Sequence, residues 1–256
     1  MRSALGVVSR SGVVRVAGDR HEPLRWASIT KLCTAMAVLI AVEEGSVGLD
    51  APAGPPGSTV RHLLAHASGL DFDTPTVLAP PGTRRVYSNT GYEVVADVLE
   101  ESTGIGYETY LREAVFDPLG IRSTTLQGSP AAGLVGPLDD LLLLAAELLA
   151  PTLLARETYI LMRTVAFPGL GGVLPGFGKQ EPNDWALGPE LRDAKSPHWT
   201  GTKNSSRTFG HFGGAGGFVW VDPVADLAVA VLSDREFGPW AAEAWPRLSD
   251  EILENR

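Results

Sequence analysis

The sequence contains a single cysteine, Cys33. One cysteine cannot close an intramolecular disulfide, so the fold does not depend on an oxidising compartment. Cys33 lies in an apolar run that is typical of a buried helix, where a free cysteine usually acts as a small hydrophobic residue. No candidate base stands near it in the sequence, which disfavours a catalytic thiol.

Basic residues are also scarce. The chain has 21 Lys and Arg against 30 Asp and Glu, a formal net charge of -9, and no basic run. Proteins that bind nucleic acid usually carry a basic patch, so we expect no nucleic-acid partner. The acidic balance favours solubility.

Long apolar runs are missing as well. The most apolar region, 138–155, is interrupted by Asp139, Asp140, Glu147 and Pro151 and is too short and too charged to span a bilayer. The first residues, MRSALGVVSRSGVV, hold no apolar stretch long enough for a signal peptide. We therefore expect no membrane partner and a cytoplasmic location.

The composition is that of an ordinary globular protein. The chain has 256 residues, of which 44% are hydrophobic and 20% charged. This length is ample for a buried core, and we expect a single domain over 1–256.

Hydrophobic periodicity predicts an α+β fold, in which hairpin-linked strands form an antiparallel sheet with helices on its faces. The long helix over 29–44 is apolar nearly all round and should be buried, with Ser28 at its N-cap. Strands are predicted at 4–9, 12–17, 185–192, 207–212, 217–222 and 226–233, helices also at 59–65, 90–102, 107–115, 138–149, 152–164 and 239–254, and an irregular crossing at 165–184.

A first candidate for chemistry is Ser28-Ile29-Thr30-Lys31. A serine hydroxyl is a weak nucleophile until a base takes its proton. Lys31 lies one helical turn after Ser28 on the same face, and its apolar neighbours favour the neutral amine, which can accept a proton. The helix N-terminus also offers backbone N–H groups to a developing anion.

A second candidate is Tyr87-Ser88-Asn89, between a Pro-Gly loop and a predicted helix. A tyrosine hydroxyl beside a lysine ammonium can be drawn toward phenolate and act as a general base. Asn89 can bind a substrate carbonyl or amide and contact the lysine. A buried tyrosine followed by an asparagine in a turn is the alternative interpretation.

The third candidate is His211-Phe212-Gly213 with the glycines after it, between two predicted strands. Glycines there let a substrate backbone approach the sheet edge closely. The N–H of Gly214 can complete an oxyanion hole with the N–H of Ser28. A glycine-rich hairpin turn is the simpler alternative.

The order of these three motifs resembles the class C β-lactamase-like serine hydrolases, which include esterases, D-aminopeptidases and penicillin-binding proteins. The resemblance extends over most of 24–234. It includes HLLAHASGL at 62–70, PGTRRVYSNTGYEVVADVLEESTG at 81–104 and TFGHFGGAGGFVWVDP at 208–223. Chance occurrence of all these pieces in order is negligible.

The resemblance implies a role for each motif residue. Ser28 attacks the substrate carbonyl and forms an acyl-enzyme. Lys31 and Tyr87 share the proton transfers, Asn89 positions the substrate, and His211, Gly213 and Gly214 form the substrate-binding strand. No metal or other cofactor is implied.

The resemblance also implies a β-lactamase/transpeptidase-like fold. Its five-stranded antiparallel sheet is flanked by helices and lies beside an inserted helical subdomain, with the site in the cleft between them. We expect the sheet subdomain at about 1–27 and 185–256 and the helical subdomain at about 28–184.

The third motif departs from the family pattern. Relatives that act on β-lactams or cell-wall peptides usually have Lys-Thr-Gly there, which binds a substrate carboxylate. Here a largely neutral imidazole, His211, and an apolar ring, Phe212, replace the lysine and the threonine. We therefore expect a carboxylesterase acting on small neutral esters, and a small-molecule ester or amide as the substrate partner.

Several alternatives remain open at this point. The same acyl-enzyme serves amide or peptide hydrolysis, including D-aminopeptidase or β-lactamase activity, and acyl transfer. A non-catalytic binding module is disfavoured because Ser28, Lys31 and Tyr87 are all retained. His62 and His66 have a spacing seen in metal sites, but no third ligand is evident. A G-x-S-x-G elbow is absent, which disfavours an α/β-hydrolase.

Overall fold

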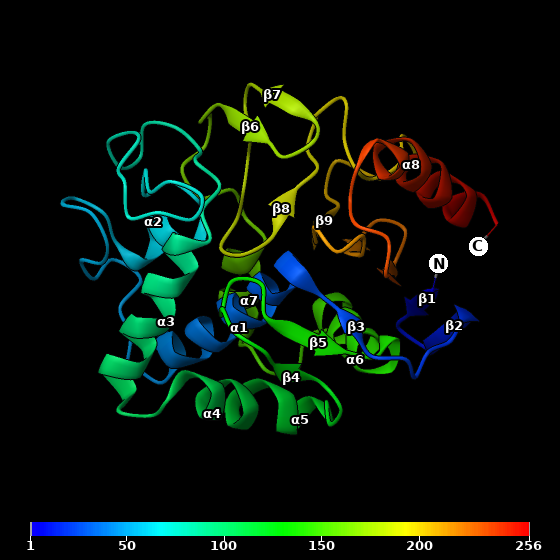
Figure 1. Cartoon of the computed structure of the whole chain (residues 1–256), viewed down its shortest axis with the longest axis horizontal. Coiled ribbons are helices and arrows are strands. Elements are labelled where there is room, and N and C mark those ends of the chain that lie inside the picture. The colour runs from blue at the N-terminus through cyan, green and yellow to red at the C-terminus, as the bar shows by residue number, and fades with distance from the viewer. Residues whose placement is uncertain (1, 256) are drawn as a thin grey trace.

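The computed structural model describes residues 2–255, which form an α+β fold around a six-stranded antiparallel sheet (Figure 1). The strand order is β2-β1-β11-β10-β9-β8, so the two ends of the chain contribute neighbouring strands. The strands are β1 (Ser3–Ser9), β2 (Gly12–Gly18), β8 (Glu190–Leu191), β9 (Phe209–Phe212), β10 (Phe218–Asp222) and β11 (Leu227–Ser233).

The expected number of five strands is therefore wrong by one, because the short strand β8 pairs with β9 at the sheet edge. The predicted strand over 185–192 is reduced to these two residues. Gly188 has a positive φ of 112°, and the N–H of Ala186 donates to the carbonyl of Pro189, so the chain turns there instead of extending.

Side chains of the central strands alternate between two cores, as the period of a strand requires. Val219 and Val221 face the larger core, and α6 (Leu138–Leu149) packs on β1, β10 and β11 from that side. Phe218 and Trp220 face the other core beneath α8 (Pro239–Glu254), where the Trp220 indole N–H donates to Ser249 Oγ at 3.1 Å. The two helices lie on opposite sides of the strands in Figure 1. By residue number α6 falls within the predicted helical subdomain, yet it covers the sheet.

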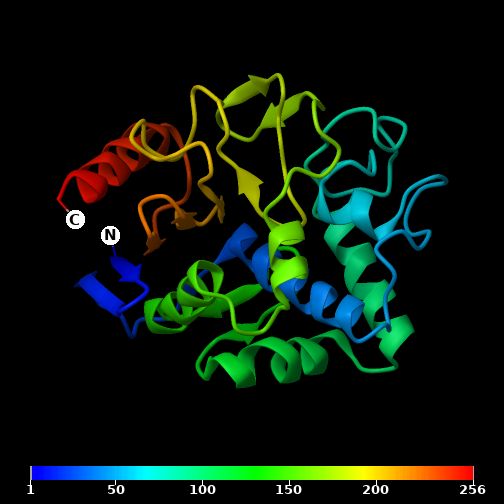
Figure 2. The ribbon, with the colours of Figure 1, turned by 180° about the vertical axis from the view of Figure 1, so that it is seen from behind.

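The remaining helices gather on the other side of the molecule from α8, as Figure 2 shows from behind. The apolar sequence of α1 (Thr30–Glu43) is explained by its place, since it is buried among these helices and beside the sheet. The others are α2 (Val60–Leu64), α3 (Thr90–Thr103), α4 (Tyr107–Leu111), a π-helical turn at Arg112–Phe116, α5 (Asp117–Leu119) and α7 (Arg156–Met162).

Two small sheets complete the fold. One joins β3 (Leu24–Arg25), β4 (Thr125–Leu126) and β5 (Leu134–Gly136) beside the start of α1. The other is a hairpin of β6 (Gly172–Leu174) and β7 (Gly178–Gln180). This hairpin lies in the segment 165–184, which the sequence predicts to be irregular.

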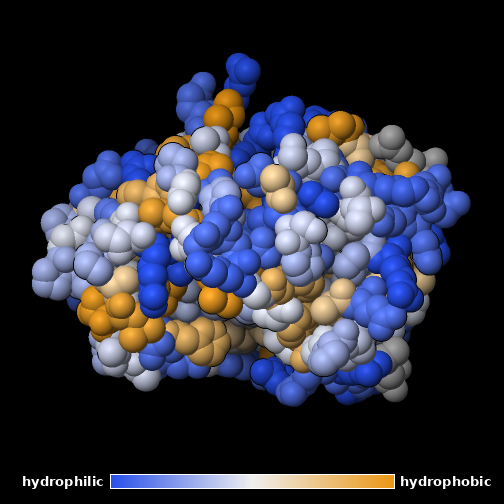
Figure 3. Space-filling model, turned by 90° about the horizontal axis from the view of Figure 1, so that it is seen from above, coloured by the Kyte–Doolittle hydropathy of each residue, from blue (hydrophilic) through white to orange (hydrophobic). Residues whose placement is uncertain are grey.

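The surface is mainly hydrophilic on the face shown in Figure 3. Hydrophilic residues cover most of the face seen in Figure 3, and hydrophobic side chains reach it in separate patches. No helix within residues 2–255 has both the length and the apolar character that crossing a membrane requires.

Candidate active site

Ser28 lies in a tight 3-10 turn, Ala27–Ile29, immediately before α1. The expectation that Ser28 caps the helix is wrong, because the N-cap is Ile29 and no side chain caps the first turn. Ala27 has a φ of 46°, in the left-handed region that non-glycine residues rarely adopt. Backbone strain of this kind is common at functional sites. It holds the Ser28 hydroxyl toward its neighbours instead of toward the helix end.

Lys31 is fully buried one turn after Ser28, as the spacing predicts. Its Nζ lies 3.4 Å from Ser28 Oγ, 2.5 Å from Asn89 Oδ1 and 3.0 Å from the Ala131 carbonyl oxygen. The two carbonyl oxygens can only accept hydrogen bonds. A neutral amine therefore gives its two hydrogens to them and turns its lone pair toward the Ser28 hydroxyl.

Burial lowers the pKa of Lys31 from its ordinary value to about 7, since the charged ammonium is poorly solvated there. The carboxylates of Asp73 and Glu93 act in the opposite direction and favour the ammonium. With a pKa of about 7, a substantial fraction of the Lys31 side chain is the unprotonated amine at neutral pH. A general base must be unprotonated to accept a proton.

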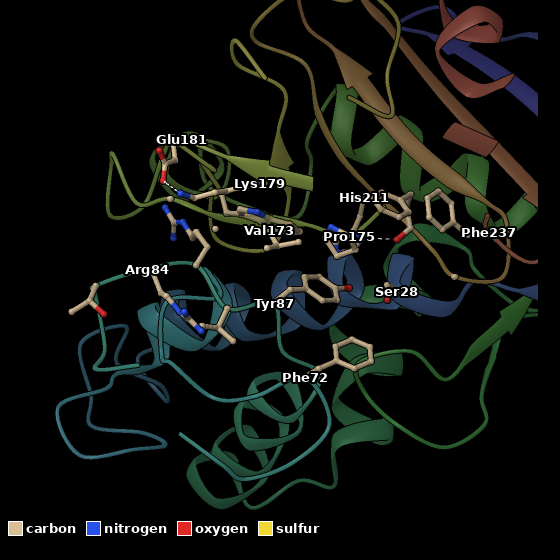
Figure 4. A pocket seen from close by; sticks show the side chains of 18 residues that line it. Ser28, Phe72, Arg84, Tyr87, Val173, Pro175, Lys179, Glu181, His211 and Phe237 are labelled. Carbon is tan, nitrogen blue, oxygen red and sulfur yellow. Dashed lines mark hydrogen bonds and ion pairs between the residues drawn. The ribbon is translucent and has the colours of Figure 1, made fainter. Parts of the chain in front are cut away.

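Tyr87 packs over Lys31, with Nζ 4.9 Å from the ring centre, and also contacts the rings of His66 and Trp185. Its hydroxyl is directed toward Ser28 (Figure 4), and the Ser28 hydroxyl acts to lower the pKa of Tyr87. Burial among these groups raises the pKa of Tyr87 above its usual range. The expected tendency toward phenolate is therefore wrong, because burial disfavours the charged phenolate and the carboxylate of Asp73 acts in the same direction.

Asn89 stands at the start of α3 and connects Lys31 to the loop that precedes the site. Its side-chain oxygen accepts from Lys31, and its Nδ2 donates to Asp73 Oδ1 at 2.8 Å. Its backbone N–H donates to the carbonyl of Phe72 at 2.7 Å. The expected contact between Asn89 and the lysine is thus present, and Asp73 fixes the orientation of the amide.

His211 is buried on β9 and lines the cavity in front of Ser28. Its Nδ1 lies 2.8 Å from the carbonyl oxygen of Phe212 and must therefore carry the hydrogen. Burial lowers the pKa of His211 to about 3, so the ring is neutral, as expected. The other nitrogen, Nε2, is an acceptor without a hydrogen-bond partner among the described residues. Neutral His211 and apolar Phe212 leave this strand without a cation.

Gly213 and Gly214 continue from β9 past the Ser28 turn. A Cβ at Gly213 would lie 2.4 Å from the Trp26 carbonyl oxygen, so only glycine lets the two segments pack this closely. A Cβ at Gly214 would meet nothing within 4 Å, because this residue borders the open cavity. No hydrogen bond between residues 2 and 255 uses the backbone N–H of Ser28 or Gly214. Both donors are thus available to an oxyanion.

A cavity of about 850 Å³ opens in front of Ser28 and is lined mainly by apolar and aromatic side chains (Figure 4). Phe72 and Phe237 stand around the nucleophile end, Val173 lies between the two ends, and Arg84, Lys179 and Glu181 lie at the other end. The other lining residues are Thr83, Arg85, Val86, Tyr87, Gly171, Gly172, Pro175, Trp185, His211, Phe212 and Gly214.

The two histidines with metal-like spacing have separate structural contacts. His62 Nδ1 lies 2.8 Å from Thr59 Oγ1, and its ring stacks on Phe167. His66 Nδ1 accepts the backbone N–H of Ser88. Among residues 2–255 no three His, Cys, Asp or Glu side chains are grouped so as to hold a metal ion.

A match to a protein-family model shows which family the chain belongs to. The family model described as Beta-lactamase matches residues 4–254, nearly the whole chain. The chain belongs to the Beta-lactamase family. The resemblance seen in the three sequence motifs is therefore confirmed, and with it a serine hydrolase family and its fold.

Solved structures of other proteins share the whole fold. A beta-lactamase from Mycobacterium bovis is 51% identical, with a TM-score of 0.98 over 99% of this chain and 94% of that chain. Simvastatin synthase from Aspergillus terreus is 19% identical, with a TM-score of 0.80 over 99% of this chain and 90% of that chain, and shows the shared fold alone.

Curated relatives match over a shorter stretch. Penicillin-binding protein 4* of Bacillus subtilis is 28% identical over 131 residues, which are 38% of this chain and 29% of that protein. The D-alanyl-D-alanine-carboxypeptidase/endopeptidase AmpH of Escherichia coli is 27% identical over 144 residues, which are 42% of this chain and 37% of that protein. The matched stretch covers about a third of each relative.

Some residues of the site carry no signal in the sequence. Asp73 lies in an irregular loop, and Ala131 contributes only a backbone carbonyl, so neither forms part of a motif. The apolar cavity wall combines the 72 loop, the β6–β7 hairpin and the segment before α8. Only the tertiary fold brings these three segments together.

Proposed function

We propose that this member of the Beta-lactamase family is a serine hydrolase that acts through an acyl-enzyme on Ser28 and prefers small neutral esters. The observation that carries the proposal is the buried Lys31, whose Nζ lies 3.4 Å from Ser28 Oγ and also contacts two carbonyl oxygens, those of the Asn89 side chain and of Ala131. A buried amine with a pKa near neutrality is a suitable base for a serine nucleophile.

In the proposed reaction, Ser28 Oγ attacks the ester carbonyl while its proton passes to Lys31, directly or through the Tyr87 hydroxyl. The backbone N–H groups of Ser28 and Gly214 stabilise the tetrahedral oxyanion. The proton then passes to the leaving alcohol, and the acyl group stays on Ser28. A water molecule, deprotonated by the same pair, releases the acid in the second half of the reaction.

The preference for neutral esters rests on β9. A substrate carboxylate next to the scissile carbonyl would meet the neutral imidazole of His211 and the ring of Phe212, not a cation. Burying an unpaired charge there is unfavourable. The cavity wall around Ser28 is apolar and suits an alkyl or aryl group.

A second candidate is β-lactam hydrolysis, which is favoured by the relative that is 51% identical and described as a beta-lactamase. Turnover of p-nitrophenyl butyrate and of a chromogenic cephalosporin separates the two. We expect kcat/KM for the ester to exceed that for the cephalosporin, and Ser28→Ala to abolish the ester activity. Faster cephalosporin turnover would replace the esterase proposal with the β-lactamase one.

The activity should depend on pH through Lys31. We expect kcat/KM for p-nitrophenyl butyrate to rise with pH through about 7, since only the neutral amine accepts a proton. Asp73→Asn removes a carboxylate that favours the ammonium but keeps an oxygen for Asn89, so the midpoint should move to lower pH.

The control for the pH profile is Asp19→Asn, the same loss of charge in the connection between β2 and β3, outside the cavity lining. It should leave the midpoint in place. A rate that is flat between pH 5 and 9, or an Asp73→Asn midpoint at higher pH, would contradict Lys31 as the base.

A further inference from the structure

Three charged side chains of the cavity lining stand at the end away from the nucleophile. Arg84, Lys179 and Glu181 lie there, while Ser28 and Phe237 lie at the other end (Figure 4). With Arg85, the lining holds three cationic side chains and one carboxylate. The chain as a whole has a net charge of -9, so this end of the cavity differs in charge from the rest of the protein.

Two of these cations are already engaged. The Arg85 guanidinium is buried and donates to backbone carbonyls of Ala65, Ala166, Phe167 and Asn183. These bonds use its nitrogens to hold the walls of the site together. Lys179 Nζ lies 2.5 Å from Glu181 Oε1, so its charge is balanced by that carboxylate.

Arg84 is different from both. It is exposed at the cavity, and it forms no ion pair or hydrogen bond with another residue between 2 and 255. A guanidinium offers a planar set of donors that matches a carboxylate. A free guanidinium at the charged end of a mainly apolar cavity defines a place for an anion.

We infer that Arg84 forms an anion-binding subsite that selects substrates with an apolar body and a terminal carboxylate remote from the scissile bond. The inference rests on the proposed serine hydrolase function. The neutral β9 strand excludes a carboxylate next to the scissile carbonyl, whereas Arg84 accepts one at the far end of the cavity. The substrate class is therefore a half ester of a dicarboxylic acid, hydrolysed at its ester end.

Matched substrates test this inference. The p-nitrophenyl half esters of glutaric, adipic and suberic acid are compared with the p-nitrophenyl alkanoates of equal chain length. At one or more lengths we expect kcat/KM for the half ester to exceed that for the alkanoate about fivefold, as for an exposed ion pair. Added salt should reduce the ratio.

Two variants locate the effect. Arg84→Ala should bring the ratio close to one, and Arg84→Glu should bring it below one. Arg156→Ala removes one positive charge from the exposed start of α7, outside the cavity, and should leave the wild-type ratio unchanged. A wild-type ratio of one or less at every length, or a ratio that persists in Arg84→Ala, would overturn the inference.

Equilibrium binding of the same esters to the Ser28→Ala variant measures the contribution of the subsite to affinity in the absence of turnover. If Ser28→Ala still hydrolyses them, the proposed function fails. If it binds the half ester no better than the alkanoate, the Arg84 inference fails and the serine mechanism is unaffected.

Discussion

Replacing Ser28 with alanine should lower kcat/KM for p-nitrophenyl butyrate by about four to six orders of magnitude, as loss of a serine nucleophile does elsewhere. The hydroxyl is the only side-chain group of the proposed mechanism that forms a bond to the acyl carbon. It does not cap α1, and its removal creates no large cavity because Ser28 is half-exposed at the cavity wall. The folded structure should therefore persist.

The measurement pairs steady-state kinetics with thermal melting followed by circular dichroism. Ser46→Ala, at an exposed position after α1, is the matched control and should keep wild-type activity. A Ser28→Ala protein that melts like wild type and retains a tenth or more of its activity would show that the nucleophile is another group.

Replacing Lys31 with methionine should have the second-largest effect. Methionine is similar in length and apolar, so it suits the buried site but cannot take a proton. We expect a loss of about two to four orders of magnitude in kcat/KM, the usual range for a general base. The loss should be mainly in kcat, because Lys31 is buried beneath Ser28 and does not line the cavity.

Lys31→Arg is the informative partner of that variant. Arginine keeps the positive charge and the donors to Asn89 and Ala131 but stays protonated at all working pH values. If the lysine acts as a base, Lys31→Arg is as inactive as Lys31→Met in protein that remains folded. Substantial activity in Lys31→Arg would mean that the residue acts only through its charge, and the proton acceptor would then be Tyr87.

The sequence correctly predicts those parts of the molecule whose structure is determined by a local pattern, such as helical periodicity, and not by contacts between distant segments. The helices Leu138–Leu149 and Pro239–Glu254 begin and end where the amphipathic pattern does. Ser28 and Lys31 face each other because a spacing of three residues brings side chains together in helical turns. The neutral state of His211 is predicted from the ordinary pKa of an imidazole, and burial in the structure lowers that pKa further.

The incorrect predictions share a tertiary origin. A serine before a helix is a typical N-cap, but Ala27 in a left-handed conformation turns the Ser28 hydroxyl toward Lys31 and Tyr87. The protonation of Tyr87 depends on the rings that bury it, and those rings come from distant segments. Asp73 reaches Asn89 from a loop without periodicity. Local propensity contains no information about such contacts.

The central claim is that Ser28 is an activated nucleophile. Incubation of the folded protein with a fluorophosphonate probe, followed by peptide mass analysis, tests it most directly. The account predicts one stoichiometric adduct on the peptide that contains Ser28, formed faster as pH rises through about 7 and absent in Ser28→Ala. Folded protein that is unlabelled at Ser28, or labelled equally in Ser28→Ala, would contradict it.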